Sequence, residues 1–156
     1  MTPAVAVEER TWPSVRRPKN RSAKLRLPPA VILDGDANAL SIARSLSLLG
    51  IRVFAVGPKD SRVRHSRHIR WITTPPARGC DKGWIEYLLG PKALFLHGAV
   101  LLPAGDAAIQ TILENREELA QRYLLEEMNP QARQCMLDKR STYQAARSAN
   151  VPTPRF

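Results

Sequence analysis

The sequence predicts an α/β fold with an open parallel sheet of four to five strands flanked by helices. Two short apolar runs, residues 30–33 and 51–57, have the β-branched composition of buried strands. Between them, residues 37–50 have a helical period, and a similar alternation resumes further along the chain. A strand, a short turn, a helix and a second strand form a βαβ unit, whose strands must run parallel.

The first unit has clear boundaries. The run "AVILDGD" from Ala30 is expected to be a strand that ends in a tight turn, because Gly and Asp follow the apolar residues. Asp36 is the expected N-cap of the following helix, and Gly50 its stop signal. Apolar residues recur every three or four positions along this helix: Ala39, Ile42, Ala43, Leu46 and Leu49.

The second half continues with strand and helix patterns. We expect a third strand at "HIRWITTP", a short helix at "GWIEYLLG" and a fourth strand at "AVLLPAGD". A long helix with an apolar face is predicted from Ala107 to Tyr123, with Asp106 as its N-cap. The next stretch, "YLLEEM", fits either a short edge strand or a connection.

Two helices are expected near the end. The first runs from Pro130 to about Met136. The second begins at Asp138, or three residues later if Ser141 and Gln144 form a capping box. We therefore predict three parts: a disordered basic tail at 1–28, a domain at 29–128 and linker helices at 129–156.

Charge and composition reduce the number of function classes that fit the sequence. The formal net charge of +10 is concentrated in residues 1–29 and 59–82, each of which carries a net charge of +5. No apolar run approaches the roughly 20 residues needed to span a bilayer, and the first residues lack the order of a signal peptide. We expect a soluble, cytoplasmic protein. Cys80 and Cys135 have no partners at ligand spacing, so neither a zinc site nor a disulfide framework is indicated.

Candidate ligand-binding residues follow the predicted strands. Open parallel sheets bind ligands at the carboxyl ends of their strands, which here read "DGDAN", "VGPKDS" and "PAGD". Gly35 and Gly105 would let a ligand approach the backbone closely. The amine or hydroxyl of a substrate would form hydrogen bonds with the side chains of Asn38 and Asp106, or with those of Asp34 and Asp36. The alternative is that the aspartates only cap helices and the glycines only form turns. The single glycine of "DGDANAL" disfavours an NAD or FAD site.

An arginine cluster, "KDSRVRHSRHIR", lies on a predicted loop after the second strand. Arg64 and Arg67 are the candidate anion-binding residues, although a solvated charge run needs no ligand. Nucleic acid is an unlikely partner, because no aromatic residues are interleaved with the arginines. The residues alone show no complete catalytic site and no metal site.

Four stretches resemble the N-terminal region of ATP-grasp carboxylate-amine ligases: "VILDGDANALSIARSLSLLGIRVFAVG", "SRHIRWITTP", "AVLLPAGDAAIQTILENREELAQRY" and "LDKRSTYQAARSANVPTPRF". The last is the most specific, because that family joins its first domain to the nucleotide-binding region through a D-K helix and a V/I-P-x-P link. The resemblance implies a Rossmann-like pre-ATP-grasp domain in which Lys139 contacts the phosphates of ATP.

The resemblance also implies the chemistry of the whole enzyme. ATP activates a carboxylate as an acyl phosphate, an amine attacks it, and Mg²⁺ bridges the phosphates. In the family, the metal-binding carboxylates, the adenine-binding strand and the lid follow the link, and this sequence ends at Phe156. We therefore expect a fragment that is inactive alone, binds no cofactor tightly and needs an ATP-grasp domain in the same or another chain. The alternatives are a stand-alone module that binds a small anion or a protein and, less favoured, RNA binding through the tail and loop.

Overall fold

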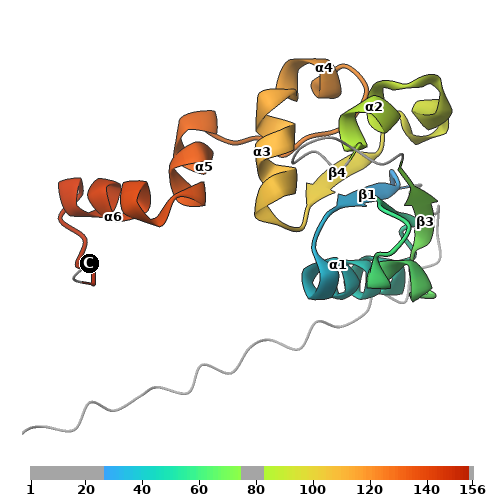
Figure 1. Ribbon diagram of the computed structural model, residues 1–156, viewed down its shortest axis with the longest axis horizontal. Helices are drawn as coiled ribbons and strands as arrows, with labels where there is room; N and C mark the ends of the chain where they lie inside the picture. The colour runs from blue at the N-terminus through green and yellow to red at the C-terminus, as the bar shows by residue number, and fades with distance from the viewer. Residues whose placement is uncertain (1–26, 75–82, 155–156) are drawn as a thin grey trace, which may run out of the picture.

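The computed structural model describes residues 27–74 and 83–154, and they form a parallel sheet flanked by helices (Figure 1). The four strands are β1 (Ala30–Leu33), β2 (Val53–Gly57), β3 (Arg70–Thr73) and β4 (Val100–Pro103). Their order is β3-β2-β1-β4, and every neighbouring pair is parallel. The predicted α/β class is confirmed.

The "YLLEEM" stretch adds only an isolated bridge to the sheet. Leu124 pairs with Val100 in parallel, and its backbone N-H donates to the carbonyl of Ala99 at 2.9 Å. The stretch is therefore a connection that touches the edge of β4.

The helices follow the predicted order, with short 3₁₀ helices added. They are α1 (Asp36–Leu48), η1 (Arg62–His65), α2 (Trp84–Leu89), η2 (Pro91–Leu96), α3 (Asp106–Glu114), α4 (Arg116–Ala120), α5 (Pro130–Leu137) and α6 (Lys139–Ser148). The prediction of a single helix from Ala107 to Tyr123 is wrong, because the helix is interrupted at Asn115, between α3 and α4. Asn115 uses its side chain to donate to the carbonyl of Thr111 at 2.9 Å, and such local bonding competes with a continuous helix.

Two predicted N-caps are also wrong. Asp36 and Asp106 are the first residues of their helices, the cap positions are taken by Gly35 and Gly105, and no side-chain cap bond forms. Asp138, in contrast, caps α6 with its carboxylate, which supports the earlier of the two predicted starts.

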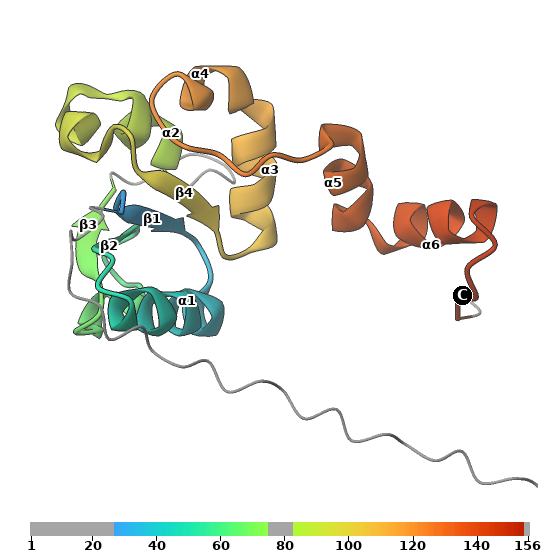
Figure 2. The same cartoon turned by 180° about the vertical axis from the view of Figure 1, so that it is seen from behind.

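Helices cover both faces of the sheet (Figures 1 and 2). Val31, Leu33 and Val56 face a core formed with α2, η2, α3 and α4. Ile32 and Ala55 face the opposite core, which α1 and η1 cover. Burial on both faces explains why the strands are continuously apolar in sequence.

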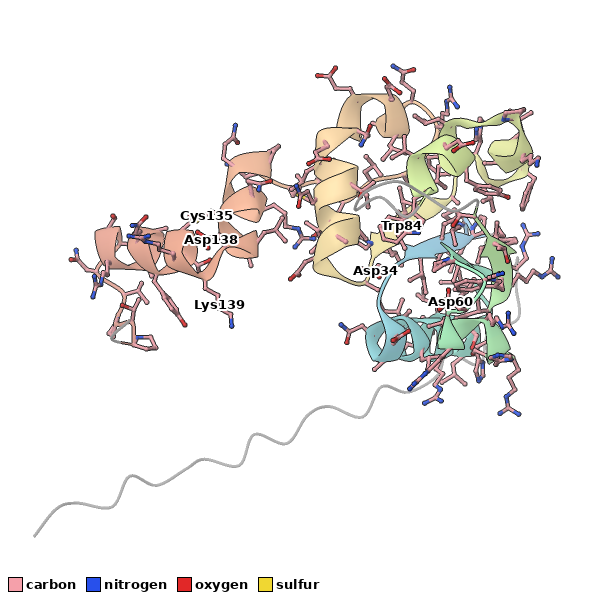
Figure 3. All side chains as sticks on the ribbon, in the orientation of Figure 1. Asp34, Asp60, Trp84, Cys135, Asp138 and Lys139 are labelled. Carbon is pink, nitrogen blue, oxygen red and sulfur yellow. The ribbon has the colours of Figure 1, made fainter. Side chains whose placement is uncertain are left out.

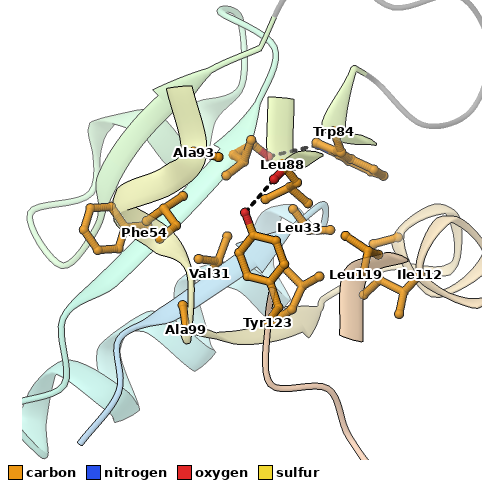
Figure 4. Packing of buried hydrophobic residues seen from close by; sticks show 14 residues of the cluster. Val31, Leu33, Phe54, Trp84, Leu88, Ala93, Ala99, Ile112, Leu119 and Tyr123 are labelled. Atoms are coloured by element: carbon orange, nitrogen blue, oxygen red, sulfur yellow. Dashed lines mark hydrogen bonds between the residues drawn. The ribbon is translucent and has the colours of Figure 1, made fainter. Parts of the chain in front are cut away.

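Two hydrogen bonds tie the larger core to the backbone (Figure 4). The indole N-H of Trp84 donates to the carbonyl of Val56 at 3.0 Å, and the hydroxyl of Tyr123 donates to the carbonyl of Leu88 at 2.8 Å. Burial raises the pKa of the Tyr123 phenol to about 12. The first bond fixes α2 to β2, and the second fixes the segment after α4 to α2.

Helices α5 and α6 extend away from the sheet and contain no buried residue (Figure 1). We call residues 129–154 the arm. Thr142 connects its two helices by donating to the carbonyl of Cys135 at 2.9 Å. Among the residues described, no helix is long and apolar enough to cross a membrane. Most of the predicted tail, and Cys80, lie outside the described residues.

Candidate functional site

The carboxyl ends of β1 and β2 border a hollow of about 310 Å³. Its lining includes Gly35 and three larger side chains, those of Asp34, Asp60 and Trp84. Figure 3 shows these three labelled side chains grouped at the same edge of the sheet. Two of the three predicted strand ends, "DGDAN" and "VGPKDS", therefore meet in space as parallel strands require.

A second hollow lies where the strand order reverses. The chain runs outward from β1 to β2 and β3, and then returns to place β4 on the other side of β1. Since α1 and α3 follow β1 and β4 and cover opposite faces, their N-termini border a crevice at this point. We call this the switch-point crevice. Its volume is about 480 Å³, and its lining includes Asn38, Ser41, Gly105, Asp106 and Arg133.

The structure thus brings three of the four predicted substrate-binding residues together. Asn38, Gly105 and Asp106 line the switch-point crevice, whereas Gly35 lines the neighbouring hollow. Asn38 and Asp106 are exposed. Both polar side chains are therefore accessible to a ligand.

The two glycines lie where the loops after β1 and β4 approach each other. A Cβ atom on Gly35 would lie 2.4 Å from the carbonyl oxygen of Ala104, and one on Gly105 would lie 2.6 Å from the carboxylate of Asp34. The Asn38 amide also donates to the carbonyl of Ala104, at 3.3 Å. The glycines therefore allow the loop after β1 and the loop after β4 to approach each other closely beside the crevice.

Arg133 is a crevice residue that sequence reasoning missed. It comes from α5, and its guanidinium pairs with the Glu126 carboxylate at 2.7 Å while its Nε atom is buried without a hydrogen-bond partner. No sequence signal marks it, because its position depends on how α5 packs against α3. Glu126 offsets part of the Arg133 charge, and the two helix N-termini add further positive potential to a crevice in which Asp106 supplies negative charge.

The predicted anion-binding arginines separate in the structure. Arg64 donates to the Lys59 carbonyl and to a ring nitrogen of His65, and it is not among the residues that line the neighbouring groove. Arg67 lines a groove of about 710 Å³ between α1 and η1, and the sequence alone did not reveal that α1 contributes Arg44 to it. We call this the basic groove; it is lined by Leu40, Arg44, Leu48, Arg62, His65, Ser66, Arg67 and His68.

Lys139 lies apart from all these residues. Figure 3 shows it on the arm, well separated from Asp34 and Asp60 at the sheet edge. It is exposed and borders a shallow hollow with Asp138, Arg140 and Tyr143. Within residues 27–74 and 83–154, no three His, Cys, Asp or Glu side chains come close enough together to hold a metal ion.

Comparison with known proteins supports the fold. No protein-family model and no curated protein matches the sequence. Among solved structures, the chain is similar to the biotin carboxylase domain of a thermophilic 2-oxoglutarate carboxylase bound to bicarbonate, with a TM-score of 0.52 and 19% identity. The match covers 80% of this chain and 28% of that one. The likeness shows the fold alone, which this chain shares with part of that domain.

Proposed function

We propose that this chain is the substrate-side domain of an ATP-dependent carboxylate-amine ligase. The observation that carries the proposal is the switch-point crevice, which gathers Asn38, Gly105 and Asp106 at the position where open parallel sheets bind ligands. The fold likeness to a biotin carboxylase domain and the D-K sequence at Asp138 and Lys139 are consistent with it.

The crevice has groups for both ends of a small substrate. The Arg133 guanidinium and the N-termini of α1 and α3 attract a carboxylate. The Asp106 carboxylate and the Asn38 amide oxygen accept hydrogen bonds from an amine. We therefore infer that a small molecule with a carboxylate or an amine group binds here and is oriented by these side chains.

The described residues fit ATP only in part. Lys139 and Arg140 supply two cations, and a lysine ammonium suits a phosphate as a point charge. However, the Asp138 carboxylate already accepts the backbone N-H groups of Arg140 and Ser141, so these do not await a phosphate. In the proposal, Lys139 is one phosphate contact, and an ATP-grasp domain supplies the others along with the Mg²⁺ ligands. No step of the reaction is assigned to this chain.

The test is an NMR titration of the 156-residue chain with short carboxylic acids, amines and amino acids. We expect shifts in the backbone amides of residues 35–38 and 104–108. Asn38→Ala and Arg133→Gln should each weaken binding about tenfold, as expected for loss of a hydrogen bond to a charged group. Arg147→Gln, which removes an exposed arginine from α6, is the control and should bind normally.

Two results would contradict the proposal. One is that no compound shifts the crevice amides, or that Asn38→Ala and Arg133→Gln bind as the wild type does. The other is micromolar, Mg²⁺-dependent ATP binding by this chain in calorimetry, because Lys139 is only a small part of a nucleotide pocket.

A further inference from the structure

The basic groove runs along α1 on the face of the sheet opposite to α3. We propose that it is a second binding site, for a small molecule that carries a phosphate group on an apolar body. This site differs from the switch-point crevice in its position and in its chemistry, and it does not depend on the proposed ligase function.

Both walls of the groove belong to fixed elements. On one wall, Leu40, Arg44 and Leu48 are spaced four residues apart and so form a single stripe along α1. The opposite wall is η1 and the chain after it, anchored by Val63, which is 3% exposed and packs into the core beneath α1. The Ser47 hydroxyl and His68 Nδ1 connect the two walls at 2.8 Å. A groove held in this way is preformed, which reduces the entropy lost on binding.

The charge of the groove favours an anion. Three guanidinium groups line it, those of Arg44, Arg62 and Arg67, and no Asp or Glu does so in the described part of the chain. None of these arginines forms an ion pair with an acidic residue within the described ranges. Arginine binds phosphate through paired N-H donors, and several guanidinium groups in one groove suit its multiple charged oxygens.

The apolar residues of the basic groove indicate what the rest of the ligand should be. Leu48 is 75% exposed, and Leu40 is half-buried beside it on the same stripe. Exposed leucine next to arginine favours a ligand whose phosphate is attached to an apolar group, which would cover this surface. No Phe, Tyr or Trp is among the described residues that line the groove, so it lacks a large aromatic surface for stacking bases, and a small phosphate ester fits it better than single-stranded nucleic acid.

The experiment uses the 156-residue chain with three probes: phenyl phosphate, inorganic phosphate and phenol. In NMR titrations, phenyl phosphate should shift the amides of residues 40–48 and 62–68 and bind more tightly than inorganic phosphate, and phenol should not bind. The double variant Arg44→Gln/Arg67→Gln should lower the affinity for phenyl phosphate at least about tenfold. Leu48→Ser should remove the advantage of phenyl phosphate over inorganic phosphate.

The control for charge is Arg147→Gln on α6, which should bind phenyl phosphate as the wild type does. Arg44, Arg67 and Leu48 are exposed, so circular dichroism should show folded variants, and Arg67→Gln alone is the substitute if the double variant unfolds. The proposal is overturned if phenyl phosphate leaves the groove amides unshifted or binds the arginine variants with unchanged affinity. It is also overturned if Arg147→Gln weakens binding as much as they do.

Discussion

At the scale of single residues, Gly35 shows how a missing side chain shapes the sheet edge. Its φ of 75° lies in the left-handed region, and a Cβ atom there would meet the carbonyl oxygen of Ala104 at 2.4 Å. Gly50 has a similar φ, 77°, but nothing lies within 4 Å of its Cβ position. A comparison of substitutions at Gly35 and Gly50 therefore separates the cost of backbone strain from the cost of steric overlap.

We expect Gly35→Ala to lower the free energy of unfolding by about 2–4 kcal/mol, because backbone strain and overlap with Ala104 add together. Gly50→Ala should lower it by only about 1 kcal/mol, from strain alone. Urea unfolding followed by circular dichroism measures both. Equal losses in the two variants would show that the loops after β1 and β4 are not in the close contact described.

Sequence reasoning placed Asn38, Gly105 and Asp106 in one site because the ends of parallel strands converge, and that geometry needs no side-chain detail. It missed Arg133 and the contribution of Arg44 to the basic groove. Helical periodicity tells which residues share a face, but not which other element packs against that face. Long-range packing decides these positions, and no local pattern encodes it.

At the scale of elements, the three aspartates at helix starts occupy two different positions. A glycine precedes Asp36 and Asp106 and occupies the cap position, so both aspartates enter the helix. Leu137 precedes Asp138, and Asp138 is itself the cap. The residue types favoured at N-cap include both glycine and aspartate, so sequence preference alone does not choose between adjacent candidates.

We expect the Asp138 carboxylate to stabilise the first turn of α6. It accepts the Ser141 hydroxyl at 2.6 Å and the Ser141 backbone N-H at 2.8 Å, and these bonds, led by the hydroxyl, hold the pKa of Asp138 below its usual 3.8. Asp138→Ala should reduce helical Cα shifts over α6 in NMR spectra. Asp106→Ala, which removes no cap bond, should leave α3 helical.

The same cap predicts a pH dependence. Because the pKa of Asp138 is lower in the folded state than in the unfolded state, its contribution to α6 is complete above the unfolded value of about 3.8. The contribution is lost as the pH falls through the lower folded value. Helical shifts of α6 that respond to acid equally in the wild type and in Asp138→Ala would argue against this role.

At the scale of the whole molecule, the chain divides into a sheet covered on both faces and an arm with no buried residue. Sequence patterns predicted the parallel sheet and the two last helices, since both depend on local period and turn residues. They did not predict how the arm contacts the sheet domain, where Arg133 of α5 pairs with Glu126. That contact joins residues only seven positions apart, but its geometry depends on the packing of α5 against α3.

This division predicts unequal stability in native-state hydrogen exchange. Amides of β1 and β2, which are central in the sheet and buried on both faces, should exchange most slowly, and those of α6 should exchange fastest among the helices of eight or more residues. Arg133→Gln should speed exchange in α5 and leave β1 unchanged, because it removes a contact of the arm and none of the sheet. Arg147→Gln is the matched control and should leave α5 unchanged. Protection of α6 equal to that of β1 would show that the arm is held by more than the contacts described.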